Sequence, residues 1–116
     1  MKENIIKTKS YAFALRVIKL YKFLSIEKKE YILSKQILRS ATSIGANVEE
    51  ADAGQSKRDF IAKLQISLKE SKETHYWLRL LRDSDFIDEN QSESLITDCN
   101  EIIYILTSIL KSAKEK

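Results

Sequence analysis

The chain contains no proline and only two glycines, Gly45 and Gly54, among its 116 residues. Architectures built from many β-turns depend on these two residue types, because they supply the backbone conformations at which strands reverse. The sequence therefore predicts an all-α protein. A chain of this length normally forms one domain, so we expect residues 1–116 to fold as a single helical unit around a small core.

Apolar residues recur at steps of three and four along four segments, which is the pattern of helices buried along one face. We expect the first helix from about Thr8 or Ser10 to Leu24, and the second from about Tyr31 to Ala53. The first segment is apolar almost all round. It therefore fits either a central place in the bundle or an additional contact between subunits.

Start and stop signals define the other helices. Gly54 stands where a helix often ends in a left-handed residue. Ser56 followed by Asp59, and Asp88 followed by Gln91, are N-cap pairs for the third and fourth helices, and the third should end near residues 82–84. Four helices joined by short connections predict an antiparallel up-down four-helix bundle. The expected buried seams are Ile61, Leu64, Leu68, Ser71, His75 and Leu78 in the third helix, and Leu95, Cys99, Ile102, Leu106 and Ile109 in the fourth.

Small residues surround the apolar stripe of the second helix. The stripe is Ile37, Ala41, Ile44, Val48 and Ala51, and Ser40, Ser43, Gly45 and Ala46 lie beside it. A glycine inside a helix costs about 1 kcal/mol relative to alanine, so it usually marks a close approach of another backbone. The second helix is therefore expected to pack tightly against other helices, within a subunit or between subunits.

The residues needed for most catalytic or metal sites are too few. His75 is the only histidine and Cys99 the only cysteine. Zinc sites and di-iron bundle sites need several such ligands in one chain, and two isolated glycines make no phosphate loop. We expect no catalytic residues, no metal and no cofactor. His75 is interpreted as a half-buried side chain that hydrogen-bonds a neighbour, and Cys99 as a small core residue.

Paired acidic residues at helical spacing usually lie on solvated faces or bind basic side chains. The pairs here are Glu49 with Glu50 and Glu70 with Glu73. Asn47 and Glu50 share a helix face, and we expect them to contact an arginine. The candidates for this arginine are Arg39 and Arg58.

Charge is distributed unevenly along the chain. Residues 1–39 contain ten Lys or Arg and three Asp or Glu, whereas residues 83–101 contain seven acidic residues and no basic one. Lys9, Arg16 and Lys19 share one face of the first helix, with Lys22 nearby, and such a face can bind phosphates with an affinity that falls as salt rises. The alternatives are a merely solvated face, or attraction between unlike surfaces of neighbouring subunits.

No apolar run reaches the roughly 18 residues needed to span a bilayer. The segment Met1 to Ile6 has no apolar block of a signal peptide. We therefore expect a cytoplasmic protein without a membrane partner, and a single cysteine fits a reducing compartment.

Several motifs together resemble a known family. These are the run from Ser34 to Ala51 with its Arg-Ser-Ala-Thr-Ser-Ile-Gly-Ala-Asn core, the segment from Ser56 to Ile61, and the segment from Leu68 to Leu81. They resemble the bacterial four-helix-bundle proteins of 23S rRNA intervening sequences. The family is similar in fold to the accessory variability protein of diversity-generating retroelements.

The resemblance implies a ring-like homopentamer without enzymatic activity. The retroelement relative binds nucleic acid and a reverse transcriptase, so RNA or DNA and a partner protein are the expected ligands here. That relative is strongly basic, whereas the net charge of this chain is only +3. The matching family positions, which we interpret as packing or subunit-contact residues, are Arg39, Ser43, Gly45, Asn47 and Glu50.

Overall fold

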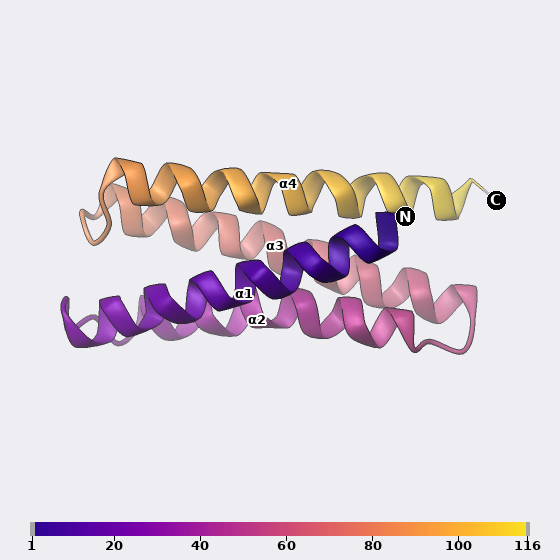
Figure 1. Cartoon of the computed structure of the whole chain (residues 1–116), viewed down its shortest axis with the longest axis horizontal. Helices are drawn as coiled ribbons and strands as arrows, with labels where there is room; N and C mark the ends of the chain where they lie inside the picture. The colour runs from indigo at the N-terminus through magenta and orange to yellow at the C-terminus, as the bar shows by residue number, and fades with distance from the viewer. Residues whose placement is uncertain (1, 116) are drawn as a thin grey trace.

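The computed structural model describes residues 2–115 and contains four antiparallel helices (Figure 1). They are α1 (Lys2–Ile26), α2 (Leu33–Asp52), α3 (Lys57–Asp83) and α4 (Glu89–Lys114). Each helix packs against two neighbours, and the pairs α1–α3 and α2–α4 lie on the diagonals. The predicted four-helix bundle is confirmed. No helix in the described part of the chain is both long enough and apolar enough to cross a bilayer.

The first helix begins earlier than the sequence indicated. It starts at Lys2 rather than near Thr8 or Ser10. Ile6 is buried in the core, and Lys7 donates to the Asp52 carboxylate at 3.0 Å. These contacts with the rest of the bundle extend the helix beyond its continuous apolar run.

Both predicted N-caps are confirmed. The Ser56 hydroxyl accepts from the Asp59 N–H at 3.1 Å, and Asp88 with Gln91 forms a complete capping box. The prediction for Gly54 is wrong, because no glycine in the described chain has a positive φ. Its role is steric: an added Cβ would lie 3.0 Å from the Ala51 carbonyl oxygen.

Helix α2 is capped by a residue that precedes it. Its own N-cap residue, Ile32, makes no side-chain cap bond. Instead, the Glu30 carboxylate accepts the N–H groups of Ile32 at 3.2 Å, Leu33 at 3.0 Å and Ser34 at 2.7 Å. Burial alone would raise the pKa of Glu30, but these backbone bonds lower it below its usual value. Glu30 therefore supplies the negative charge that the start of a helix favours.

Helix α2 approaches both of its neighbours closely. A Cβ placed on Gly45 would lie 3.5 Å from Ser10 Oγ of α1 and 3.6 Å from the Ser10 carbonyl oxygen. On the other side, the Ser67 hydroxyl of α3 donates to the Ile44 carbonyl at 2.8 Å. The expected tight packing of the small-residue stripe is thus present within one subunit.

The buried seam of α3 differs from the expected one by single positions. The expected residues Leu64, Ser71 and Leu78 are buried, but Ile61, Leu68 and His75 are only half-buried. Ser67 and Thr74 take the buried places beside them. Their small side chains let α3 lie close to α2, and Thr74 Oγ1 lies 2.8 Å from Ser40 Oγ. In α4, all five expected seam residues are buried.

Candidate nucleic-acid interface

The four basic residues predicted on α1 divide into two pairs. Lys9 forms an ion pair with Glu101 of α4. Arg16 pairs with Asp98 of α4 and also donates to Ser94 Oγ at 2.9 Å. The charges of these two residues are therefore offset within the bundle, so they are less available to an external phosphate.

Lys19 and Lys22 are exposed and form no ion pair within residues 2–115. They lead toward the α1–α2 connection, where further exposed lysines follow. We call the set the lysine end, and it consists of Lys19, Lys22, Lys28, Lys29 and Lys35. Tyr31, about half exposed, lies in the same connection and offers an aromatic ring. Glu27 and Glu30 lie in the same connection, but neither forms an ion pair with these lysines within residues 2–115, and the Glu30 carboxylate accepts backbone N–H groups of α2.

The acidic segment, residues 83–101, begins at the same end of the bundle with the α3–α4 connection and continues into α4 (Figure 1). Asp83 pairs with its neighbour Arg82 at 2.8 Å. Asp85, Asp88, Glu89 and Glu93 are also exposed and lie near this connection. The end of the bundle that contains both connections therefore carries a basic side and an acidic side.

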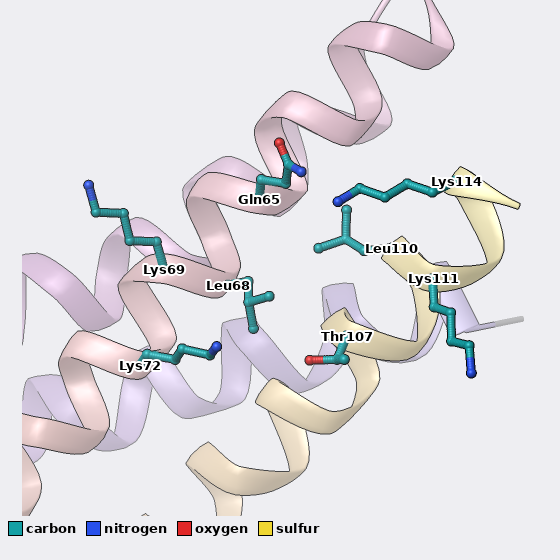
Figure 2. A pocket seen from close by; sticks show the side chains of 8 residues that line it. All are labelled: Gln65, Leu68, Lys69, Lys72, Thr107, Leu110, Lys111 and Lys114. Atoms are coloured by element: carbon teal, nitrogen blue, oxygen red, sulfur yellow. The ribbon is translucent and has the colours of Figure 1, made fainter.

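A second basic surface is a groove between α3 and α4, toward the other end of the bundle (Figure 2). Its volume is about 630 Å³. The residues that line it are Gln65, Leu68, Lys69, Lys72, Thr107, Leu110, Lys111 and Lys114. None of its four lysines forms an ion pair within the described residues, and no acidic side chain lines it. We call it the α3–α4 groove.

Sequence reasoning missed this groove. In the sequence, Lys69 and Lys72 stand beside the acidic Glu70 and Glu73, and Lys111 and Lys114 lie at the end of the fourth helix, where basic residues are common. The signal was present as lysine pairs at a spacing of three, each beside a leucine, namely Leu68 and Leu110. Only the packing of α3 against α4 reveals that both pairs border one groove.

The family-position residues of α2 make contacts inside the subunit. Arg39 pairs with Glu70 at 3.0 Å and with Glu73. Glu50 pairs with Lys63 at 2.8 Å, and Gly45 packs against Ser10 as described above. These three residues hold α2 to α3 or α1.

The expected contact of Asn47 and Glu50 with an arginine is wrong. Asn47 donates instead to the Ser43 carbonyl at 2.8 Å and to Ser43 Oγ at 3.1 Å. The reason is geometric: one turn of α2 already supplies acceptors for the amide, while Glu50 faces Lys63. Arg39 lies nearer the N-terminus of α2, opposite the acids of α3.

His75 and Cys99 have the structural surroundings expected of them. His75 Nδ1 accepts from Arg79 Nε at 3.1 Å, and burial together with Arg79 and Arg82 lowers the pKa of the imidazole. The Cys99 thiol donates to the Ser71 carbonyl at 3.2 Å, and burial raises its pKa to about 12. A thiol with that pKa is protonated at neutral pH and a poor nucleophile.

Comparison with known proteins shows which family this bundle belongs to. The family model of the 23S rRNA-intervening sequence proteins matches residues 2–108. The chain belongs to this family. A crystal structure from Bacteroides thetaiotaomicron, described as a protein with unknown function from the S23 ribosomal protein family, is similar with a TM-score of 0.94. Its sequence is 55% identical, and the match covers 96% of this chain and 99% of that one. No curated protein matched.

Membership of the intervening-sequence family is consistent with the motifs that carried the resemblance. The Arg-Ser-Ala-Thr-Ser-Ile-Gly-Ala-Asn run forms the middle of α2, the helix in closest contact with its neighbours. In this member of the family, the run therefore secures the fold of the subunit.

Proposed function

We propose that this chain is a non-enzymatic, homo-oligomeric protein of the cytoplasm that binds RNA or DNA phosphates through its lysine end. The observation that carries the proposal is the presence of five exposed lysines around one connection, beside a carboxylate already used as a helix cap. Neutralising phosphates with lysines releases counterions, which makes affinity fall steeply with salt. Tyr31 adds a ring on which an unpaired base can stack.

A ring-like homopentamer is part of the proposal. Its support is the outer face of α1, where Ile5, Tyr11 and Leu15 are 45%, 65% and 48% exposed. Large apolar side chains grouped on one helix face suit contact with another subunit. This favours the second explanation for the all-round apolar first helix. A ring would present several copies of the lysine end to one nucleic acid.

Binding of the purified chain to structured RNA and to duplex DNA, measured across a salt series, tests the phosphate proposal. The double charge reversal Lys19→Glu with Lys22→Glu should weaken binding at least about tenfold at low salt. The matched control is Lys69→Glu with Lys72→Glu, which changes the same charge at the same helical spacing on α3. Equal effects of the two variants, or none, would refute the assignment to the lysine end.

The oligomer is tested separately by its mass in solution. Tyr11→Glu with Leu15→Glu places two charges on the apolar outer face of α1, so the assembly should dissociate while helicity is retained. A wild-type mass of one subunit would contradict the pentamer, and an unchanged mass of the variant would exclude this face from the contact.

A second candidate function is docking of a partner protein, which the acidic α3–α4 connection favours. A reverse transcriptase is the partner that the resemblance suggests. Recovery of a partner after nuclease treatment, and its loss when Asp85 and Glu89 are changed to Lys, would support this function over nucleic-acid binding.

A further inference from the structure

The α3–α4 groove arises because α3 crosses the bundle. Near their shared connection the two helices lie side by side, and they diverge toward the opposite end, where α3 lies beside α2 (Figure 1). Contact of α3 with α2 is correspondingly more extensive than its contact with α4. The groove lies on the diverging half, between residues 65–72 of α3 and 107–114 of α4.

The groove has an aliphatic floor and two cationic rims. Leu68 and Leu110 form the floor, and the rims are Lys69 with Lys72 on α3 and Lys111 with Lys114 on α4. Residues three apart lie on one side of a helix, so each rim presents a lysine pair. Lys72 and Lys114 extend over the groove, whereas Lys69 and Lys111 point away from its floor (Figure 2).

These features distinguish the groove from the lysine end. No aromatic side chain and no arginine line it, so nucleic-acid bases find no surface for stacking. The aliphatic floor favours the binding of apolar groups, and the two lysine rims favour acidic groups on both sides of those apolar groups. An amphipathic helix with apolar residues at i, i+3, i+4 and i+7 and acids along the flanks has that distribution.

We propose that the α3–α4 groove binds an acidic amphipathic helix of a partner protein. The apolar stripe of the partner packs on Leu68 and Leu110, and its acidic flanks pair with the four lysines. The added helix completes the packing that the divergence of α3 from α4 leaves open. The proposal concerns a different surface from the phosphate-binding lysine end and does not depend on it.

A synthetic peptide of about 18 residues, or five helical turns, tests the proposal by fluorescence anisotropy with the purified chain. The peptide carries leucines on one stripe and glutamates on both flanks. A scrambled peptide of the same composition keeps the charge but has no stripe. The ordered peptide should bind at least about tenfold more tightly than the scrambled one, because only the ordered peptide can use the floor.

Variants assign the binding to the groove. Lys69→Glu with Lys72→Glu should weaken peptide binding at least about tenfold, and Lys19→Glu with Lys22→Glu should leave it unchanged. Thr107→Trp fills the groove from an exposed position without changing charge, so it should also block the ordered peptide. Circular dichroism verifies that each variant is folded.

Three results would overturn the proposal. The first is no binding of the ordered peptide, and the second is equal binding of the two peptides, which would indicate nonspecific attraction of charge. The third is loss of RNA or DNA binding in the groove variants with peptide binding intact, which would assign the groove to nucleic acid. If the lysine end does not bind nucleic acid in the salt series, the interpretation of these peptide results stays the same.

Discussion

Helices α2 and α4 occupy diagonal corners of the same bundle but contact their neighbours in different ways. Helix α2 meets α1 and α3 through small residues and direct approaches of backbone, as at Gly45 and Ser67. Helix α4 meets α1 partly through ion pairs of long side chains, and its contact with α1 is the least extensive of the neighbouring pairs.

The hollows beside α4 are larger than the hollow beside α2. The α3–α4 groove has a volume of about 630 Å³, and two hollows between α1 and α4 have volumes of about 310 and 120 Å³. The hollow beneath the end of α2 has a volume of about 10 Å³. Small residues let α2 lie close to α1 and α3, although ion pairs of long side chains join these helices as well. The three larger of these hollows therefore lie along α4.

The largest expected effect is at Gly45. Gly45→Leu places a branched side chain against the Ser10 backbone, so the free energy of unfolding should fall by about 1–3 kcal/mol. Thr107→Leu adds bulk at the exposed groove side of α4 and should change stability by less than about 0.5 kcal/mol. Urea unfolding measures both, and similar losses would show that the two helices do not differ in packing.

A control at the same position separates bulk from backbone effects. In Gly45→Ala the added Cβ reaches ordinary contact distance from Ser10 Oγ, 3.5 Å. The higher helix propensity of alanine, by up to about 1 kcal/mol, should then stabilise the chain. A destabilised Gly45→Ala variant would mean that the interface tolerates no added atom.

The caps of the two helices give the next effect. Helix α4 has its own capping box, whereas α2 depends on Glu30. Glu30→Ala should therefore cost about 0.5–2 kcal/mol, in the range of other lost N-caps. Thermal or urea unfolding at neutral pH measures this loss, and an unchanged midpoint would contradict the role of Glu30.

The same residue predicts a dependence on pH. The folded-state pKa of Glu30 is lowered, so its contribution is fully present above the ordinary pKa and is lost as pH falls through the folded pKa. The stability difference between the wild type and Glu30→Gln should be constant above about pH 5 and shrink below it. A stability difference that grows as the pH falls would contradict a lowered pKa of Glu30 in the folded state.

The smallest effect is expected at the α1–α4 ion pairs. Arg16 and Asp98 are 39% and 43% exposed, and exposed pairs contribute about 0.2–1 kcal/mol. A double-mutant cycle with Arg16→Met and Asp98→Asn should give a coupling within this range that decreases with salt. A coupling well above it would show that α4 is held more firmly than its hollows suggest.

The sequence predicted best where large apolar residues repeat. The three-four spacing distinguishes Leu95 and Ile102 from their apolar neighbours Ile96 and Ile103, so the seam of α4 was placed correctly. In α3, the three-four spacing favoured Leu68 and His75, but Ser67 and Thr74 are buried because they permit close helix contact and their hydroxyls form hydrogen bonds. Propensity patterns do not contain this information.

The candidate site was less predictable because charge becomes available or unavailable only through folding. Lys9 and Arg16 look equivalent to Lys19 and Lys22 in the sequence. Their partners, Glu101 and Asp98, lie in the last helix. The pairing depends on α4 lying beside α1, so counting charges along α1 overestimates the surface that α1 offers to a phosphate.

The buried Cys99 has a kinetic consequence. It is the only thiol of the chain, and it lies between α4 and the Ser71 carbonyl of α3. A thiol reagent can reach it only when these two helices separate, so the rate of labelling reports how often they part. A helix bound in the adjacent groove should hold α3 and α4 together and therefore lower the rate of labelling.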